Sequence, residues 1–311
     1  MIRSLKGTIK ERTVDPTSFD IPTIYKDGNE WVTDYDIEII GTPKRGSYAL
    51  PAYTIVKQVG SNVKVAGFIK LENDEIPADL FKYAFNVTDL SNCFTTYGSV
   101  PVFAKSIPEG LFDSCTKVTS FSGVFAYFIK IKSVPEGLFK NCSNVTAADN
   151  MFKDCRSLEE VPEDLFASFS NVTSYNSVFA DCMKLNYIPE NLFANSPIAS
   201  EFQGSFYNCK GIEEIPAKLF ANNPDIGTLR ATFSYCDNLV KVPATLLDSN
   251  TKITEFNDTF YRCKSIEDPE NGDMSWLWKS RQNDPNINAE GCFMYCDETL
   301  ENYDNIPDKW K

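Results

Sequence analysis

Apolar residues recur along most of the chain at a fixed interval of 27 residues. The same step separates a Val-Pro or Ile-Pro dipeptide, a leucine and a cysteine in successive segments. A period between about 20 and 50 residues is typical of a solenoid, in which each coil buries its apolar face only against its neighbours. The pattern therefore predicts a repeat solenoid. Six phenylalanines mark its core: Phe125, Phe152, Phe179, Phe206, Phe233 and Phe260.

Two irregularities interrupt the period. Ile76-Pro77 lies 31 residues before Ile107-Pro108, so an early coil carries four extra residues, which we place around Tyr97 to Lys105. Near the other end, Phe260 and Phe293 are 33 residues apart, and the six extra residues fall within Asp268 to Gly291. Since insertions in repeat proteins form loops on the surface, both segments are expected to project from the stack.

One coil is expected to hold a strand and two short helical segments. Leu185 to Ile188 resembles a short strand that ends at a proline, which cannot donate the next hydrogen bond of a ladder. Residues 189–195 start with that proline and predict one helical turn. Residues 176–182 predict a second short helix or 3₁₀ turn. The expected class is thus an α/β repeat solenoid over residues 71–311, with an irregular loop at 268–291 and a terminal coil at 292–311.

The first 70 residues lack the period and predict a small β-rich module. Trp31 to Ile40 alternates partly as a strand, and residues 53–59 with 63–71 predict a hairpin about Gly60-Ser61-Asn62. Such a module covers the open end of a solenoid, whose last coil must not expose apolar surface or strand edges. Because 70 residues exceed what a cap needs, we expect residues 1–70 to be an anchor as well.

Composition sets limits on partners and location. With 42% hydrophobic residues, 23% charged residues and no apolar run of 18, the chain resembles an ordinary soluble protein without membrane insertion. The net charge of -13 argues against nucleic acid as a partner. Acidity that keeps the stack soluble is favoured over an acidic binding patch. The first residues lack the apolar core of a signal peptide, so the chain is expected to stay where it is made unless a leader was removed.

Several catalytic chemistries are absent from the sequence. It contains no histidine, which excludes the common general base and the Ser-His-Asp and Cys-His arrangements, and it contains no phosphate-binding glycine motif. The pairs Glu159-Glu160 and Glu213-Glu214 resemble glycosidase carboxylates, but they recur at one position of the coil. A solvated outer face is therefore the favoured interpretation. We expect no enzyme and no cofactor.

The ten cysteines favour packing over bridges or metal. Five share one coil position beside the ladder phenylalanine, as expected of free cysteines that pack as small apolar residues. Phe128 and Phe169 replace cysteine at equivalent positions, and phenylalanine can fill a packing position but cannot bind metal or form a bridge. Cys292 and Cys296 form the closest pair, and without histidine they are weak candidates for zinc.

Candidate binding residues lie where the repeat is irregular. Tryptophans and cations on a long loop are residue types enriched at interaction hot spots, although the same tryptophans are equally suited to cover the last coil. The first candidate group is Trp276, Trp278, Lys279 and Arg281. The earlier insertion supplies a second and weaker group, Tyr97, Val100 and Phe103.

The unit Asn144-Val145-Thr146, Met151-Phe152, Cys155 and Leu158 resembles the BspA-like leucine-rich repeats of bacterial surface proteins over residues 76–307. This resemblance implies a right-handed leucine-rich-repeat solenoid whose relatives bind host proteins, other cells or glycans. Such repeats also occur in appendages of phages that infect gut bacteria. The resemblance thus implies a phage virion protein that contacts other virion proteins through residues 1–70 and displays the solenoid for assembly or host attachment. A bacterial cell-surface adhesin without its leader and an intracellular scaffold remain alternatives.

Overall fold

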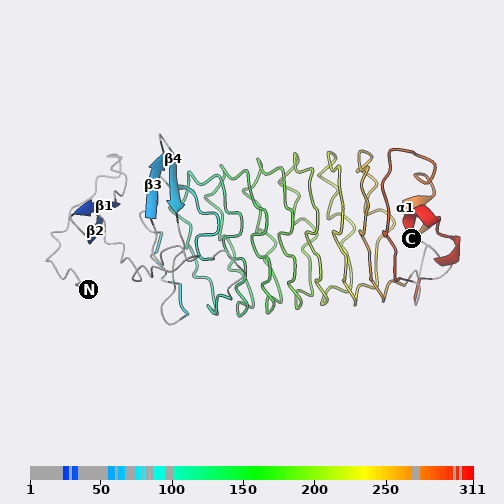
Figure 1. The fold of residues 1–311 in the computed structure, drawn as a ribbon, viewed down its shortest axis with the longest axis horizontal. Coiled ribbons are helices and arrows are strands. Elements are labelled where there is room, and N and C mark those ends of the chain that lie inside the picture. Colours follow the sequence, from blue (N-terminus) through cyan, green and yellow to red (C-terminus); the bar gives the residue numbers. More distant parts are fainter. Residues whose placement is uncertain are drawn as a thin grey trace.

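The fold is seen in a computed structural model (Figure 1). It describes residues 74–76, 78, 80–81, 84, 87–95, 101–267, 274–296, 299–300 and 303–311. It also gives the backbone of four strands nearer the amino terminus: β1 (Ile24–Asp27), β2 (Glu30–Thr33), β3 (Ile55–Val59) and β4 (Asn62–Ala66).

The main body is a stack of similar coils along one axis (Figure 1). Parallel bridges join equivalent residues 27 apart in successive coils, for example Ser174 with Glu201 and Glu201 with Thr228. The predicted repeat solenoid is therefore confirmed. In the figure the coils follow the sequence in order from one end of the stack to the other, so each coil contacts mainly the coils before and after it.

A ladder of phenylalanine rings fills the centre of the stack. Neighbouring rings have centroids 5.5 to 6.0 Å apart and are tilted by only 2° to 17°, and all are buried. Each buried ring contributes about 2 to 3 kcal/mol of transfer free energy. The inward alignment that the sequence predicts is confirmed. The ladder consists of Phe94, Phe125, Phe152, Phe179, Phe206, Phe233, Phe260 and Phe293.

Turns take the place of the predicted helices in the coils. The backbone N–H groups of Ser177, Phe179 and Asp181 donate to carbonyls of the next coil at 2.8, 2.9 and 2.7 Å. The residues between them donate three positions back within the coil, as in a 3₁₀ turn. Ser177 and Asp181 have left-handed backbone angles, φ +54° and +64°, which prevent these turns from joining into a helix. Residues 176–182 thus form the 3₁₀-type alternative, and a helix there is wrong.

The predicted strand is also shorter than expected. At its position the coils meet through single bridges, Ser133 with Glu160 and Glu214 with Lys241, and a second column of bridges runs through Ser174 and Glu201. Within the described coils each pairing is one residue long, because tight turns follow on either side. Among the described residues, regular helix occurs only in the carboxy-terminal part: α1 (Ser275–Trp278) and the 3₁₀ helices η1 (Tyr303–Asn305) and η2 (Asp308–Trp310). None of the described helices has the length and apolar character needed to cross a membrane.

The amino-terminal strands form hairpins, and one of them extends the solenoid. β1 pairs with β2, and β3 pairs with β4, both antiparallel, so the hairpin predicted about residues 60–62 is present. β4 also pairs in parallel with β5 (Val87–Asp89), and Asp89 in turn bridges to Ser120. This pairing crosses the predicted boundary at residue 70. Of the strand predicted over Trp31 to Ile40, β2 contains the first three residues, and the rest lies outside the described part.

The carboxy terminus closes the other end of the stack. The N–H groups of Gly291 and Phe293 donate to the carbonyls of Lys311 and Trp310 at 3.2 and 2.9 Å, at the positions where earlier coils donate to the coil that follows them. Trp310 is fully buried, with its ring 5.3 Å from Phe256 and 6.4 Å from Phe293. The last residues therefore satisfy the backbone donors and cover the aromatic core together.

Candidate functional site

The cysteines form a second ladder inside the stack. Cys182 Sγ donates to the carbonyl of Phe152 at 3.2 Å, and Cys209 Sγ donates to that of Phe179 at 3.1 Å. All ten thiols are free and buried. Burial raises the pKa of Cys236 to about 12, which keeps the thiol protonated as a donor. The predicted packing role is confirmed, and thiols of successive coils also satisfy core carbonyls. The same bond recurs for Cys155, Cys236, Cys263 and Cys296.

The acidic pairs lie on a solvated face. Glu159 and Glu214 form ion pairs with Lys132 and Lys241 of the adjoining coils at 3.2 and 3.1 Å. Both partners of each pair are substantially exposed, so each pair contributes little to stability. The arrangement agrees with the outer face expected from the sequence. Among the described residues, no cluster of three or more His, Cys, Asp or Glu side chains is arranged to hold a metal ion.

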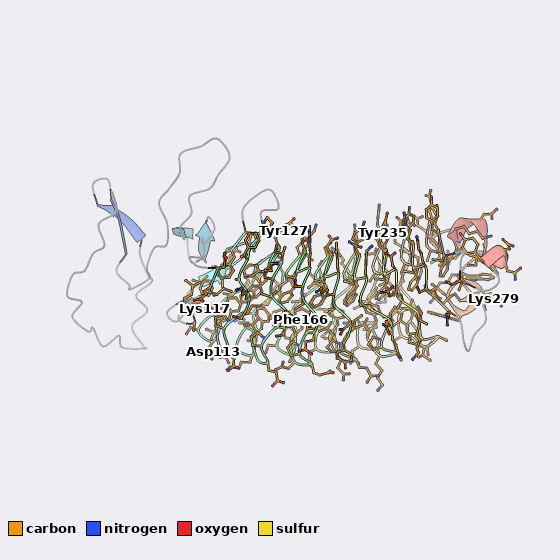
Figure 2. The ribbon with its side chains drawn as sticks, turned by 90° about the horizontal axis from the view of Figure 1, so that it is seen from below. Asp113, Lys117, Tyr127, Phe166, Tyr235 and Lys279 are labelled. Carbon is orange, nitrogen blue, oxygen red and sulfur yellow. The ribbon has the colours of Figure 1, made fainter. Side chains whose placement is uncertain are left out.

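Helix α1 places its two tryptophans against the end of the stack. Trp278 is 5% exposed and belongs to the core, and Trp276 is half-buried against it. Arg281 is also drawn inward: it donates to the Leu277 carbonyl at 2.9 Å, and its guanidinium lies 5.6 Å from the Phe256 ring. The structure thus gives Trp278 the covering role that the sequence left open. Lys279 is exposed at the tip (Figure 2), and its role in binding stays a prediction.

The earlier insertion returns to the edge of the first full coils. Val102 N donates to the Tyr127 carbonyl at 2.8 Å, and Ile129 N donates to the Val102 carbonyl at 3.1 Å. This places Phe103 at the surface with 46% of its side chain exposed. Tyr97 and Val100 lie outside the described residues. Phe103 therefore remains a candidate contact, and its predicted partner Tyr97 has no described position.

The structure also assembles a group that sequence reasoning did not find, here called the tyrosine row. Its members come from four successive coils, and each ring centroid is 5.3 Å from the next. Three of the side chains are half-buried and the last is 51% exposed. The row consists of Tyr207, Tyr235, Tyr261 and Tyr295.

A cation lies within this row. The guanidinium carbon of Arg262 is 5.3 Å from the Tyr235 ring centroid and 5.8 Å from that of Tyr295. Cation–π contacts of this kind hold a long side chain in one place and keep its charge near the surface. Tyr127 and Tyr235 lie along the same edge of the stack, opposite Asp113 (Figure 2). The row thus occupies the carboxy-terminal half of one long edge.

The tyrosine row is not apparent in the sequence, because its members do not follow the 27-residue period. Tyr207 and Tyr261 directly follow a ladder phenylalanine, whereas Tyr235 and Tyr295 come two residues after one, so the four do not share a register. The ring contacts nevertheless bring the two registers together at one edge. The signal available beforehand was that a tyrosine follows the ladder residue within two positions in four consecutive coils.

The phenol groups of Tyr207 and Tyr261 stay protonated at neutral pH. Burial, then the neighbouring Tyr235 and then Asp181 raise the pKa of Tyr207 above its ordinary value of 10.0. Desolvation followed by the nearby phenols of Tyr235 and Tyr295 raises the pKa of Tyr261 in the same direction. A neutral phenol both donates and accepts a hydrogen bond. The edge therefore combines aromatic surface, neutral hydroxyl groups and one fixed positive charge.

Comparisons with known proteins concern the fold alone. No protein-family model matches the chain, and no curated protein sequence matches it. Among solved structures, a leucine-rich repeat protein from Eubacterium ventriosum is 14% identical over 64% of this chain and 47% of its own, with a TM-score of 0.28. A leucine-rich cell surface protein from Faecalibacterium prausnitzii is 16% identical over 91% and 94%, with a TM-score of 0.23.

A third similar structure is that of the Toll–Spatzle complex from Drosophila. It is 16% identical over 76% of this chain and 30% of its own, with a TM-score of 0.37. The chain spans less than half the length of the first structures that it matches. By name, the Eubacterium structure is a leucine-rich repeat protein and the Faecalibacterium structure is a leucine-rich cell surface protein.

Proposed function

We propose that this chain is a non-enzymatic recognition protein, a BspA-like leucine-rich-repeat solenoid of 27-residue coils that forms part of a bacteriophage virion. The observation that carries recognition is the contrast between a constant interior and a variable edge. The ladder position is phenylalanine in every coil, whereas the residue that follows it changes from coil to coil and reaches the surface in some of them. A rigid frame with a varied outer surface supports binding of a partner. At this position Lys153, Tyr207 and Tyr261 are partly exposed, whereas Ala126, Ala180 and Ser234 are buried.

Placement in a virion rests on the resemblance of the repeats to those of phage appendages. In this proposal, residues 1–70 contact other virion proteins and the solenoid is displayed for assembly or host attachment. A bacterial cell-surface adhesin is the alternative, because the same repeats resemble those of bacterial surface proteins. Mass spectrometry of purified phage particles and of host envelope fractions separates the two. Peptides from this chain in particles support the virion role, and peptides confined to the envelope overturn it.

The anchor role is tested by two nested deletions. Removing residues 1–54 keeps β3 and β4, of which β4 covers the edge of the first coil by pairing with β5. This variant is expected to melt at the wild-type temperature and to be missing from particles. Removing residues 1–70 also removes β3 and β4 and leaves the strand edge of β5 unpaired, so a lower melting temperature is expected. If the 1–54 deletion still enters particles at wild-type abundance, the anchor lies elsewhere.

A further inference from the structure

We propose that the tyrosine row is a binding surface for a linear polysaccharide that carries carboxylate groups, with the sugar chain running along the solenoid axis. The proposal rests on the recognition role given above and names the chemistry of the ligand. It is carried by three features of the edge: the regular spacing of the rings, their neutral hydroxyl groups and the position of Arg262.

The spacing favours a polymer with repeating units. Successive ring centroids are 5.3 Å apart over four coils, so the surface offers nearly equal contacts at equal steps. An extended sugar chain advances by a similar distance per ring and presents C–H faces and hydroxyl edges in alternation. Neighbouring tyrosines are inclined to one another by 60°, 50° and 89°, so the row presents both ring faces and ring edges. A folded protein partner has no such repeat to match.

Arg262 favours an acidic chain. Other arginines of the coils are already paired with carboxylates, Arg156 with Asp154 and Arg230 with Glu255. Within the described part of the chain, no carboxylate lies within ion-pair distance of Arg262, although both neighbouring tyrosine rings hold it in place. Its Nε is buried without an acceptor. A ligand at the surface would therefore be bound by the terminal N–H groups of the guanidinium. Guanidinium binds carboxylate through paired hydrogen bonds.

Nucleic acid carries anionic groups and stackable rings too, but it fits this surface poorly. Single-stranded nucleic acid is bound by grooves in which many cations follow the phosphates. Here one arginine stands among four tyrosines, and the chain as a whole has a net charge of -13. A sparsely charged sugar chain matches one cation among several rings better than a phosphate at every unit.

The test uses the full chain and a panel of linear polysaccharides that carry a carboxylate on only some of their sugar units: hyaluronan, heparosan and gellan. Fully methyl-esterified hyaluronan serves as the uncharged counterpart. Binding is measured by titration calorimetry at low and high salt. We expect at least one carboxylated chain to bind, and Arg262→Gln to weaken that binding at least tenfold while leaving the methyl ester unchanged. Tyr235→Ala combined with Tyr295→Ala should weaken both. Tyr187→Ala is the matched control, since Tyr187 is 50% exposed and lies outside the row.

Two results would overturn the inference. One is that no carboxylated chain binds the wild-type protein. The other is that binding survives unchanged in the double tyrosine variant while that variant keeps the wild-type melting temperature. A cell-attachment assay separates failure of this inference from failure of the proposed recognition function. Wild-type attachment that the row variants retain rejects this surface only, whereas a wild-type chain that neither attaches nor enters particles rejects the proposed function.

Discussion

At the scale of single residues, left-handed backbone positions decide which side chain is tolerated. The residue two before each ladder phenylalanine has positive φ, and this column contains Asn150, Ser177 and Asp258 as well as glycines. Gly291, at φ +70°, lies one coil after Asp258, and a Cβ atom added there would be 2.5 Å from Asp258 Oδ1. Other residues accept this angle elsewhere in the column, so the close approach to Asp258 is what favours glycine at position 291.

A matched pair of glycine substitutions tests this requirement. Gly291→Ala should destabilise the protein by about 1 to 2 kcal/mol, since it combines left-handed strain with a clash. Gly227→Ala should be neutral or stabilise by up to about 1 kcal/mol, because its Cβ would meet nothing within 4 Å and its φ is not left-handed. Urea unfolding of both variants provides the measurement. Equal effects at the two positions would contradict the argument.

At the scale of elements, helix α1 shows how an irregular segment is used by the core. Its four residues bury Leu277 and Trp278, and Arg281 just after the helix donates back to the Leu277 carbonyl. A loop rich in tryptophan and cations looks the same in sequence whether it binds a partner or covers a stack. The choice depends on whether apolar surface is waiting beneath it, and here the rim of the last coil provides that surface.

Alanine substitutions in α1 separate covering from binding. Trp278→Ala should lower the free energy of unfolding by about 3 to 5 kcal/mol, as expected for a large side chain removed from a core. Lys279→Ala should leave stability within about 0.5 kcal/mol, because the side chain is exposed. Both are measured by chemical unfolding. A Trp278 variant as stable as the wild type would reject the covering role.

At the scale of the whole molecule, the buried thiols make the free energy of unfolding depend on pH in the alkaline range. Burial raises the pKa of Cys142 and Cys236 to about 12, from 9.0 in the unfolded chain. The folded protein therefore keeps protons that the unfolded chain releases above pH 9. Stability is fully present below that pH and falls as the pH rises towards the folded pKa values. Burial also raises the thiol pKa at Cys93, Cys115, Cys155, Cys209, Cys263 and Cys292.

The free energy of unfolding should therefore fall steeply as the pH rises above 9. Each shifted thiol removes about 1.4 kcal/mol of stability per pH unit once the pH exceeds the unfolded pKa. The urea midpoint is expected to drop sharply between pH 9 and about pH 10.5. Cys236→Ser keeps a donor at that position and should reduce the slope by the share of one thiol. A midpoint that does not change with pH over this range would reject the linkage.

Much of the architecture follows from the sequence alone, because a solenoid core repeats. The 27-residue interval of Phe152, Phe179 and Phe206 determines that equivalent side chains lie over one another, and it also indicates that the cysteines beside them are packing residues. The hairpin formed by β3 and β4 was visible in the same way, as two apolar runs about a short turn. These features depend on local pattern and spacing, which the sequence states directly.

Only the tertiary structure determined the features that do not follow the 27-residue period. It showed turns where helices were expected, because alternate backbone N–H groups bond to the next coil and left-handed residues interrupt each turn. It directed Trp278 into the core, and it joined Tyr207, Tyr235, Tyr261 and Tyr295 into one row. These outcomes depend on how neighbouring coils face one another at the surface and at the ends of the stack. That relation arises only once the chain has folded.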